Sequence, residues 1–245
     1  MRPICLALHS TLALAIAAAA LTLPREARAG EALPAVEPEA HVIPLPPPRW
    51  GLHSGDTIDQ GSTLIYGEVG FPDVSIGFQR GVSSNIDLGF RASFFYGIDY
   101  VVPRSRPSNV TQLTPGLGLS IPVRFTLVRS DRVSVLVHAD PGLKFDGFNP
   151  KVFAGPELPL GIDLGVHLTQ RSTLTLGADI PLSLRVTPDV TGFIPLLVGL
   201  TFESCFTDRF GMSFNLRSGV VHGINKTGSD TDLGLLGQVG FLGRI

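Results

Sequence analysis

Residues 232–245 read DLGLLGQVGFLGRI, and this stretch decides the fold class. Apolar residues or glycine occupy every second position from Leu233 to Ile245, while Gln238 and Arg244 fall on the other face. Side chains of a β-strand alternate between two faces, whereas those of a helix repeat about every 3.6 residues. The stretch therefore predicts a strand with one apolar and one mixed face.

The same alternation runs through most of the chain. Ten segments carry it: 63–71, 73–80, 84–97, 115–128, 132–146, 157–170, 172–186, 192–204, 209–221 and 232–245. Nearly all reach the roughly 9–11 residues that a tilted strand needs to cross the hydrocarbon layer of a membrane. We therefore expect an all-β protein, an antiparallel up-and-down transmembrane β-barrel of about ten strands, with eight or twelve as alternatives.

Charged residues inside these segments fall opposite the apolar rows. Asp87 and Arg91 are an even number of residues apart, as are Asp140 and Lys144, so each pair shares a face of its strand. In a barrel this face lines the lumen, and buried charges there need partners. The expected lumen charge network is Glu68, Asp87, Arg91, Arg124, Asp140, Lys144, Asp163, Asp179, Arg185, Glu203, Arg217 and Arg244. Its signs balance, which predicts a paired interior or a narrow, weakly selective polar channel.

The connections differ in length. Ser130-Asp131, Gln170-Arg171 and Thr207-Asp208 form tight polar turns, whereas most of the intervening links are longer. Short turns at one end and longer loops at the other are typical of outer-membrane barrels. With ten strands, both chain ends would lie on the side of the short turns.

Composition and charge limit the function classes. Apolar residues make up 44% of the chain and charged residues 16%, with 28 Gly and 20 Pro. The formal net charge of −2 is not that of a nucleic-acid-binding protein. Its two cysteines, Cys5 and Cys205, fall in different expected segments, so no internal disulfide is expected. No cofactor or metal motif stands out.

The N-terminus has the pattern of an export signal. Arg2 precedes an apolar run at 12–23, and Ala27-Arg28-Ala29 fits a small-x-small cleavage site. We therefore divide the chain into a signal peptide (1–29), a Pro-rich periplasmic leader (30–60) and the barrel (61–245). Proline fixes φ and lacks a donor, so the Pro-rich stretch 30–48 favours an extended spacer; binding a periplasmic partner is the alternative.

The closing strand also resembles a family. Gly237-Gln-Val-Gly-Phe-Leu-Gly-Arg-Ile245 looks like the last strand of Gram-negative outer-membrane β-barrel proteins, although those usually end in an aromatic residue and this one ends in Ile245. The resemblance is architectural. It implies a location in the outer membrane, contact with its lipid and recognition by the barrel assembly machinery. It implies no substrate, and oligomeric state stays open.

Five prolines oppose the strand prediction. Pro122, Pro141, Pro159, Pro181 and Pro195 lie within expected strands, and proline cannot donate to a ladder. We expect them at one height, with Pro141 facing Pro159 and Pro181 facing Pro195. Bulges or early fraying of the ladder would accommodate them.

Three functions remain open at this stage. The first is a non-enzymatic outer-membrane barrel with a structural role or a narrow pore for small solutes. The second is a soluble periplasmic or secreted β-protein that binds an apolar ligand, because a soluble sheet also alternates. The third is an outer-membrane hydrolase. Ser134, His138 and Asp140 share one face, but Ser134 and His138 would lie about 13 Å apart along the strand, too far for a nucleophile and its base.

Overall fold

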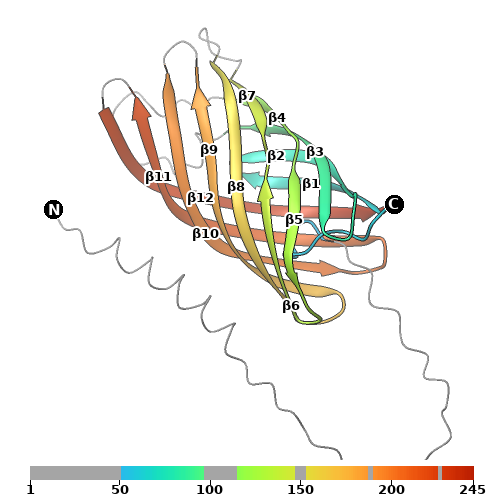
Figure 1. The fold of residues 1–245 in the computed structure, drawn as a ribbon. Coiled ribbons are helices and arrows are strands. Elements are labelled where there is room, and N and C mark those ends of the chain that lie inside the picture. Colours follow the sequence, from blue (N-terminus) through green and yellow to red (C-terminus); the bar gives the residue numbers. More distant parts are fainter. Residues whose placement is uncertain (1–50, 97–114, 147–152, 187–189, 226–227) are drawn as a thin grey trace, which may run out of the picture. The chain divides into compact units, whose positions relative to one another are not determined.

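The computed structural model describes residues 51–96, 115–146, 153–186, 190–225 and 228–245, which are coloured in Figure 1. The expected signal peptide and the Pro-rich stretch lie outside these residues. The strands are β1 (Thr63–Phe71), β2 (Asp73–Gly81), β3 (Ile86–Phe95), β4 (Gly116–Ser120), β5 (Val123–Arg129), β6 (Val133–Ala139), β7 (Gly142–Asp146), β8 (Phe153–His167), β9 (Ser172–Arg185), β10 (Thr191–Cys205), β11 (Phe210–Asn225) and β12 (Gly228–Arg244). No helix in this part of the chain is long and apolar enough to cross a membrane.

The twelve strands make ten strands of a closed wall. β4 and β5 are two halves of one wall strand, since both pair with β3, and β6 and β7 are two halves of the next, since both pair with β8. The first strand, β1, pairs antiparallel with β2 and with the last strand, β12, which closes the sheet. The expected all-β, ten-stranded up-and-down antiparallel barrel is confirmed.

Alternation in the sequence becomes alternation in burial. In β2, the side chains of Val74, Ile76 and Phe78 are exposed, whereas Ser75 and Gln79 are buried. The period of two matches the pleat of a strand, so one face of the wall is apolar and outward and the other is inward. The order is inverted relative to a soluble core, because large apolar side chains point out and polar ones point in.

The two ends of the barrel differ. At the turn end, which carries residues 82–85, 130–132, 168–171 and 206–209, the chain reverses tightly and β1 begins beside the end of β12. Ser130 illustrates the turn chemistry, because its Oγ accepts a hydrogen bond of 3.0 Å from the backbone N–H of Val133. The opposite end, here the loop end, contains the longer connections. Strands β8 to β12 have 14–17 residues and β1 to β3 only 9–10, so the wall is taller on the β8–β12 side.

The five prolines form a row across the wall, here the proline row. Pro159 is paired with Pro181, and Pro195 lies opposite Pro181 where the β9–β10 ladder is interrupted between Phe193 and Leu197. The expected facing of Pro181 and Pro195 is confirmed, whereas that of Pro141 and Pro159 is wrong, because Asp140 lies opposite Pro159. The expectation of bulges or early fraying at the prolines is also wrong. The register is the same on both sides of each break, and the strands continue to the loop end.

The reason is that proline loses only its donor. The carbonyl of Pro159 accepts a hydrogen bond of 2.9 Å from Asp140, and that of Pro141 accepts one of 2.9 Å from Ile121. These acceptors hold neighbouring strands in register across the row, so no extra residue has to be inserted.

Among the described residues, a register shift occurs elsewhere, in β5. Between Thr126 and Val128 the pairing with β6 moves by one residue, so Leu127 and Val128 both point outward. A bulge re-aims the residues that follow it. Arg129 is turned to the inner face in this way, although strict alternation would place it outside.

Candidate functional site: the barrel lumen

The inner face of the wall carries the charged residues predicted for the lumen. Glu68, Asp87, Arg124, Asp163, Asp179, Glu203 and Arg217 are buried, and Arg91, Asp140, Lys144, Arg185 and Arg244 are half-buried. The structure brings them together in several groups, and residues that the sequence did not single out complete most of these groups.

The central group is built around Arg217 of β11. Its Nη2 lies 2.9 Å from Asp163 Oδ1, and its Nη1 contacts Asp179 Oδ2. His138 Nε2 lies 3.2 Å from the other oxygen of Asp179 and 3.8 Å from Asp163, while His138 Nδ1 lies 3.8 Å from Asp140. One guanidinium thus neutralises two buried carboxylates, and the imidazole connects them to a third.

Glycines give the Arg217 side chain its path. Arg217 on β11 is paired with Gly199 on β10, and Gly199 is paired with Gly177 on β9. Gly177 is paired with Asp163 on β8, so the guanidinium extends past two glycines to reach Asp163. A Cβ on Gly177 would lie 2.4 Å from Asp163 Oδ1 and 2.6 Å from Arg217 Cζ. Side chains at these two positions would block the ion pair, so glycine is required by the close approach.

A second group lies on β1, β2 and β3. Arg91 Nη2 lies 3.1 Å from Asp73 and 3.7 Å from Glu68, and Ser75 Oγ lies 3.4 Å from the same carboxylate of Glu68. His53, which precedes the barrel strands, reaches Glu68 with its Nε2 at 2.8 Å. Glu68 is only 2% exposed, so these contacts compensate for the water that it loses.

The remaining predicted charges nearer the loop end have local contacts. Lys144 Nζ lies 3.5 Å from Glu157 Oε2 and 5.0 Å from the centre of the Phe95 ring. Arg185 lies 5.1 Å from the centre of the Phe193 ring. These distances fit ordinary ion-pair and cation–π interactions.

Residues 51–60, here the plug segment, are bound by the inner wall near the turn end. Glu203 accepts hydrogen bonds of 2.9 and 3.0 Å from the backbone N–H groups of Leu52 and His53. Asp87 accepts from the N–H of Ile58 at 3.1 Å. Carboxylates from two different strands therefore bind the backbone of one short segment. On sequence this segment was grouped with the leader, whereas here it belongs to the folded unit.

Arginines bind the same segment. Arg124 donates to the carbonyls of Gly51 and Asp56 at 3.1 and 2.7 Å, and lies 3.7 Å from Asp87. Arg129 donates to the Asp56 carboxylate through Nε at 2.8 Å and through Nη2. Arg244 Nη2 lies 3.2 Å from Asp59. The segment is thus held by charge-assisted hydrogen bonds on several sides.

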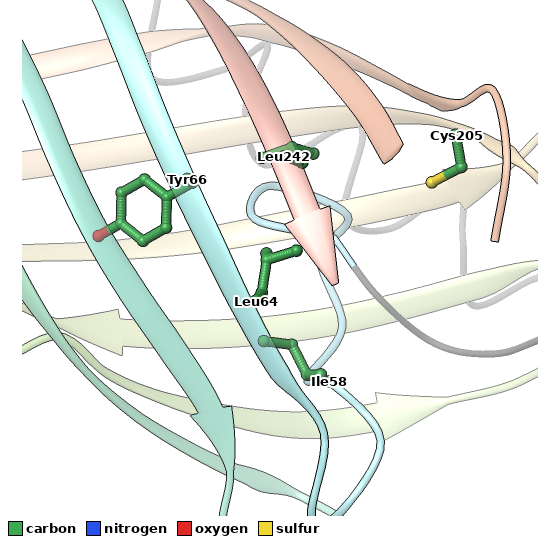
Figure 2. Close-up of a cluster of buried hydrophobic side chains, with 5 residues drawn as sticks. All are labelled: Ile58, Leu64, Tyr66, Cys205 and Leu242. Carbon is green, nitrogen blue, oxygen red and sulfur yellow. The ribbon is translucent and has the colours of Figure 1, made fainter. Parts of the chain in front are cut away.

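A small apolar cluster anchors its C-terminal part. Ile58, Leu64, Tyr66, Cys205 and Leu242 are buried together, and Leu52 packs against them. Figure 2 shows Ile58 on the coil that precedes β1, beside Leu64. The structure therefore places Cys205 in a buried cluster inside the wall.

Ser134 is not joined to His138. Its Oγ lies 3.2 Å from Nε2 of His167 and 3.4 Å from the carbonyl oxygen of Ser54 in the plug segment. The Nδ1 of His167 lies 3.1 Å from Thr173 Oγ1. Ser134 is fully buried. A serine–histidine contact is one way to activate a nucleophile, but it is not sufficient for catalysis, because a substrate must also reach the serine.

Comparisons with protein-family models, with curated proteins and with solved structures found no match to this chain.

No group of three or more His, Cys, Asp or Glu residues in the described ranges is arranged to hold a metal ion. The chemistry available to the lumen is that of paired charges, hydroxyls and amides.

Sequence reasoning missed several contributors for identifiable reasons. Glu157 is an even number of residues from Asp163, so the alternation rule would have placed it inside. Arg129 was hidden by the bulge, which reverses the phase of the strand. His53, Asp56 and Asp59 lie in a segment without periodicity, and their partners are distant in sequence, so no local pattern could identify them.

Proposed function

We propose that this protein is an exported β-barrel of the Gram-negative outer membrane, with lipid around its wall and a polar, largely self-paired lumen. Its role is structural or that of a narrow pore for small solutes, and it is not enzymatic. The export signal expected at 1–29 and the closing strand, which resembles those handled by the barrel assembly machinery, support this location.

The observation that carries the proposal is the apolar outer surface. Every wall strand contributes exposed large apolar side chains, while the charged groups of the strand interiors point inward. One example from each wall strand, in order around the barrel, is Ile65, Ile76, Phe90, Leu119, Leu143, Ile162, Leu176, Leu200, Leu216 and Phe241. Arg80, an outward charge, lies at the turn end of β2. A soluble protein rarely exposes a continuous apolar surface of this extent.

The polarity of the lumen argues against the soluble alternative. A soluble barrel that binds an apolar ligand needs an apolar interior and a polar exterior. Here the interior contains Asp163, Asp179 and Arg217 at its centre, and the exterior is apolar. This inversion is typical of transmembrane barrels.

The contacts within the lumen favour a closed resting state. The central charges are paired with one another, and the plug segment is bound across strands β1, β3, β5, β6 and β10 near the turn end. Ser134 is fully buried, and its Oγ lies 3.4 Å from the Ser54 carbonyl oxygen of the plug segment. Its contact with His167 therefore supports a structural role.

Cell fractionation and gel mobility test the proposal. We expect the protein in the outer-membrane fraction and, because closed barrels resist unfolding, a shift in mobility between unheated and boiled samples. Planar-bilayer recordings then separate a pore from a closed barrel. Recovery as a soluble periplasmic protein without a mobility shift would contradict the proposal and favour a secreted β-protein.

A further inference from the structure

The contacts of the plug segment resemble those of a bound peptide more than those of a strand. Apart from an isolated bridge between Gln60 and Gly81, residues 51–60 do not join the sheet. Instead, side chains from the wall bind its backbone: Glu203 accepts from two N–H groups, Asp87 accepts from a third, and Arg124 donates to two carbonyls.

The wall is also shaped for this segment. Gly55 has φ of +70°, and a Cβ there would lie 2.5 Å from the backbone N of Gly165 on β8. A Cβ on Gly165 would in turn lie 2.0 Å from the carbonyl oxygen of Ser54. Gly55 and Gly165 therefore lie where the segment packs closely against β8, and a side chain at either position would clash.

The segment can leave without breaking the barrel. Its polar contacts are hydrogen bonds and ion pairs that water can replace once the segment leaves, and its apolar anchor consists of Ile58 and the partly buried Leu52. The wall strands pair with one another independently of it. Gly61, with φ of +84° and open space around its Cβ position, joins the segment to β1 and can act as its hinge.

The part of the lumen near the turn end is suited to water. Among the described residues, both amide atoms of Gln79 and the hydroxyls of Thr175 and Ser213 are buried without a hydrogen-bond partner in the protein. Burying such groups without a partner is costly, and water satisfies them when the space is polar. These residues come from β2, β9 and β11, so the demand for water extends around the wall.

We propose that residues 51–60 form a releasable plug, a peptide bound in cis, whose release at Gly61 opens a water-filled path through the barrel. The Asp56–Arg129 ion pair and the Gly55–Gly165 contact hold it in the closed position. The proposal rests on the membrane barrel proposed above, and it adds the regulation of its lumen.

Two variants release the plug by different routes. Arg129→Gln removes the ion pair to Asp56, and Gly165→Ala places a methyl group against the Ser54 carbonyl without changing any charge. Two matched controls leave the lumen intact. Arg80→Gln removes an exposed outward charge at the turn end of β2, and Gly237→Ala adds a methyl group on the outer face, where the nearest atom would be 3.8 Å away.

Two readouts follow the full mature protein in lipid bilayers. The first is modification of Cys205, which is buried in the cluster with Ile58, by a charged methanethiosulfonate reagent. The second is single-channel conductance. We expect both plug variants to raise the modification rate and the open probability about tenfold or more. Arg129→Gln loses a charge-assisted bond, which changes a population by about that factor, and Gly165→Ala introduces a clash with the Ser54 carbonyl. Both controls should behave like the wild type.

The outcomes separate this proposal from the one on which it rests. A protein that fails to insert or lacks a heat-dependent mobility shift contradicts the membrane barrel itself. Inserted variants that modify and conduct like the wild type show that the segment is a fixed part of the wall. Faster modification without conductance shows release into a closed lumen, and it also overturns the proposal.

Discussion

At the scale of single residues, the centre of the lumen depends on Arg217. It is 2% exposed and contacts two carboxylates from different strands, with glycines at 177 and 199 leaving room for its side chain. A buried ion pair contributes little compared with an apolar pair of the same shape, but removing one partner leaves an uncompensated charge. Loss of Arg217 therefore leaves two buried carboxylates without their arginine, whereas loss of either Asp leaves Arg217 with one carboxylate partner.

Arg217→Met should lower the free energy of unfolding by about 3–5 kcal/mol, the usual cost of leaving a buried charge without its partner. Asp163→Asn should cost less, because Arg217 retains its contact with Asp179. Urea unfolding followed by gel mobility in detergent or lipid measures both. The exposed ion pair of Arg171 provides the control, and Arg171→Met should change stability by no more than about 1 kcal/mol. Equal effects of Arg217→Met and Arg171→Met would contradict a buried, partnered centre.

At the scale of elements, the proline row divides the wall without displacing it. Pro181 and Pro195 oppose each other, and neither has a backbone N–H to donate, so the β9–β10 ladder is interrupted there. The carbonyls along the row still accept bonds from neighbouring strands, which keeps the register. The wall is therefore weakest in backbone hydrogen bonds along one line that crosses neighbouring strands.

Amide hydrogen exchange should reveal this line. We expect segments 180–182 and 194–196 to exchange faster than segments 174–176 and 200–202 of the same strands, because local opening requires fewer broken bonds there. Pro195→Val supplies a donor and should slow exchange in both segments near the row. Mass spectrometry of proteolytic peptides measures this. Uniform protection along β9 and β10 in the wild type would show that the row does not weaken the wall.

At the scale of the whole molecule, the inverted distribution of polarity is the decisive property. Apolar side chains cover the outside of all ten wall strands and charges line the inside. In water this arrangement would expose far more apolar surface than a soluble protein tolerates, whereas in lipid it is favourable.

An arginine on the outer face distinguishes lipid from water. Ile162→Arg and Leu200→Arg replace exposed side chains on β8 and β10, and each should cost about 2–4 kcal/mol if the site lies near the middle of a bilayer. Folding into lipid vesicles, measured by gel mobility over a urea series, should show the loss. Gln170→Arg, at an exposed turn residue, is the control and should have little effect. If the outer-face variants fold as well as the control, the apolar surface does not contact lipid.

Much of the architecture could be predicted because it is encoded locally. A period of two is a property of neighbouring residues, so the alternation in 232–245 and nine other segments predicted ten strands and the face that each charge occupies. Tight turns such as Ser130-Asp131 could be predicted from the sequence for the same reason, since a turn closes within four residues.

Only the tertiary structure decided the contacts between distant parts of the chain. No sequence pattern links Leu52 to Glu203, which are separated by 151 residues, or Asp56 to Arg129, and the bulge that turns Arg129 inward interrupts the pattern itself. The sequence alone determined which side chains alternate, because the pleat of a strand dictates it. Closure of the sheet determined which of them meet, because strands far apart in sequence become neighbours across the lumen only when the first pairs with the last.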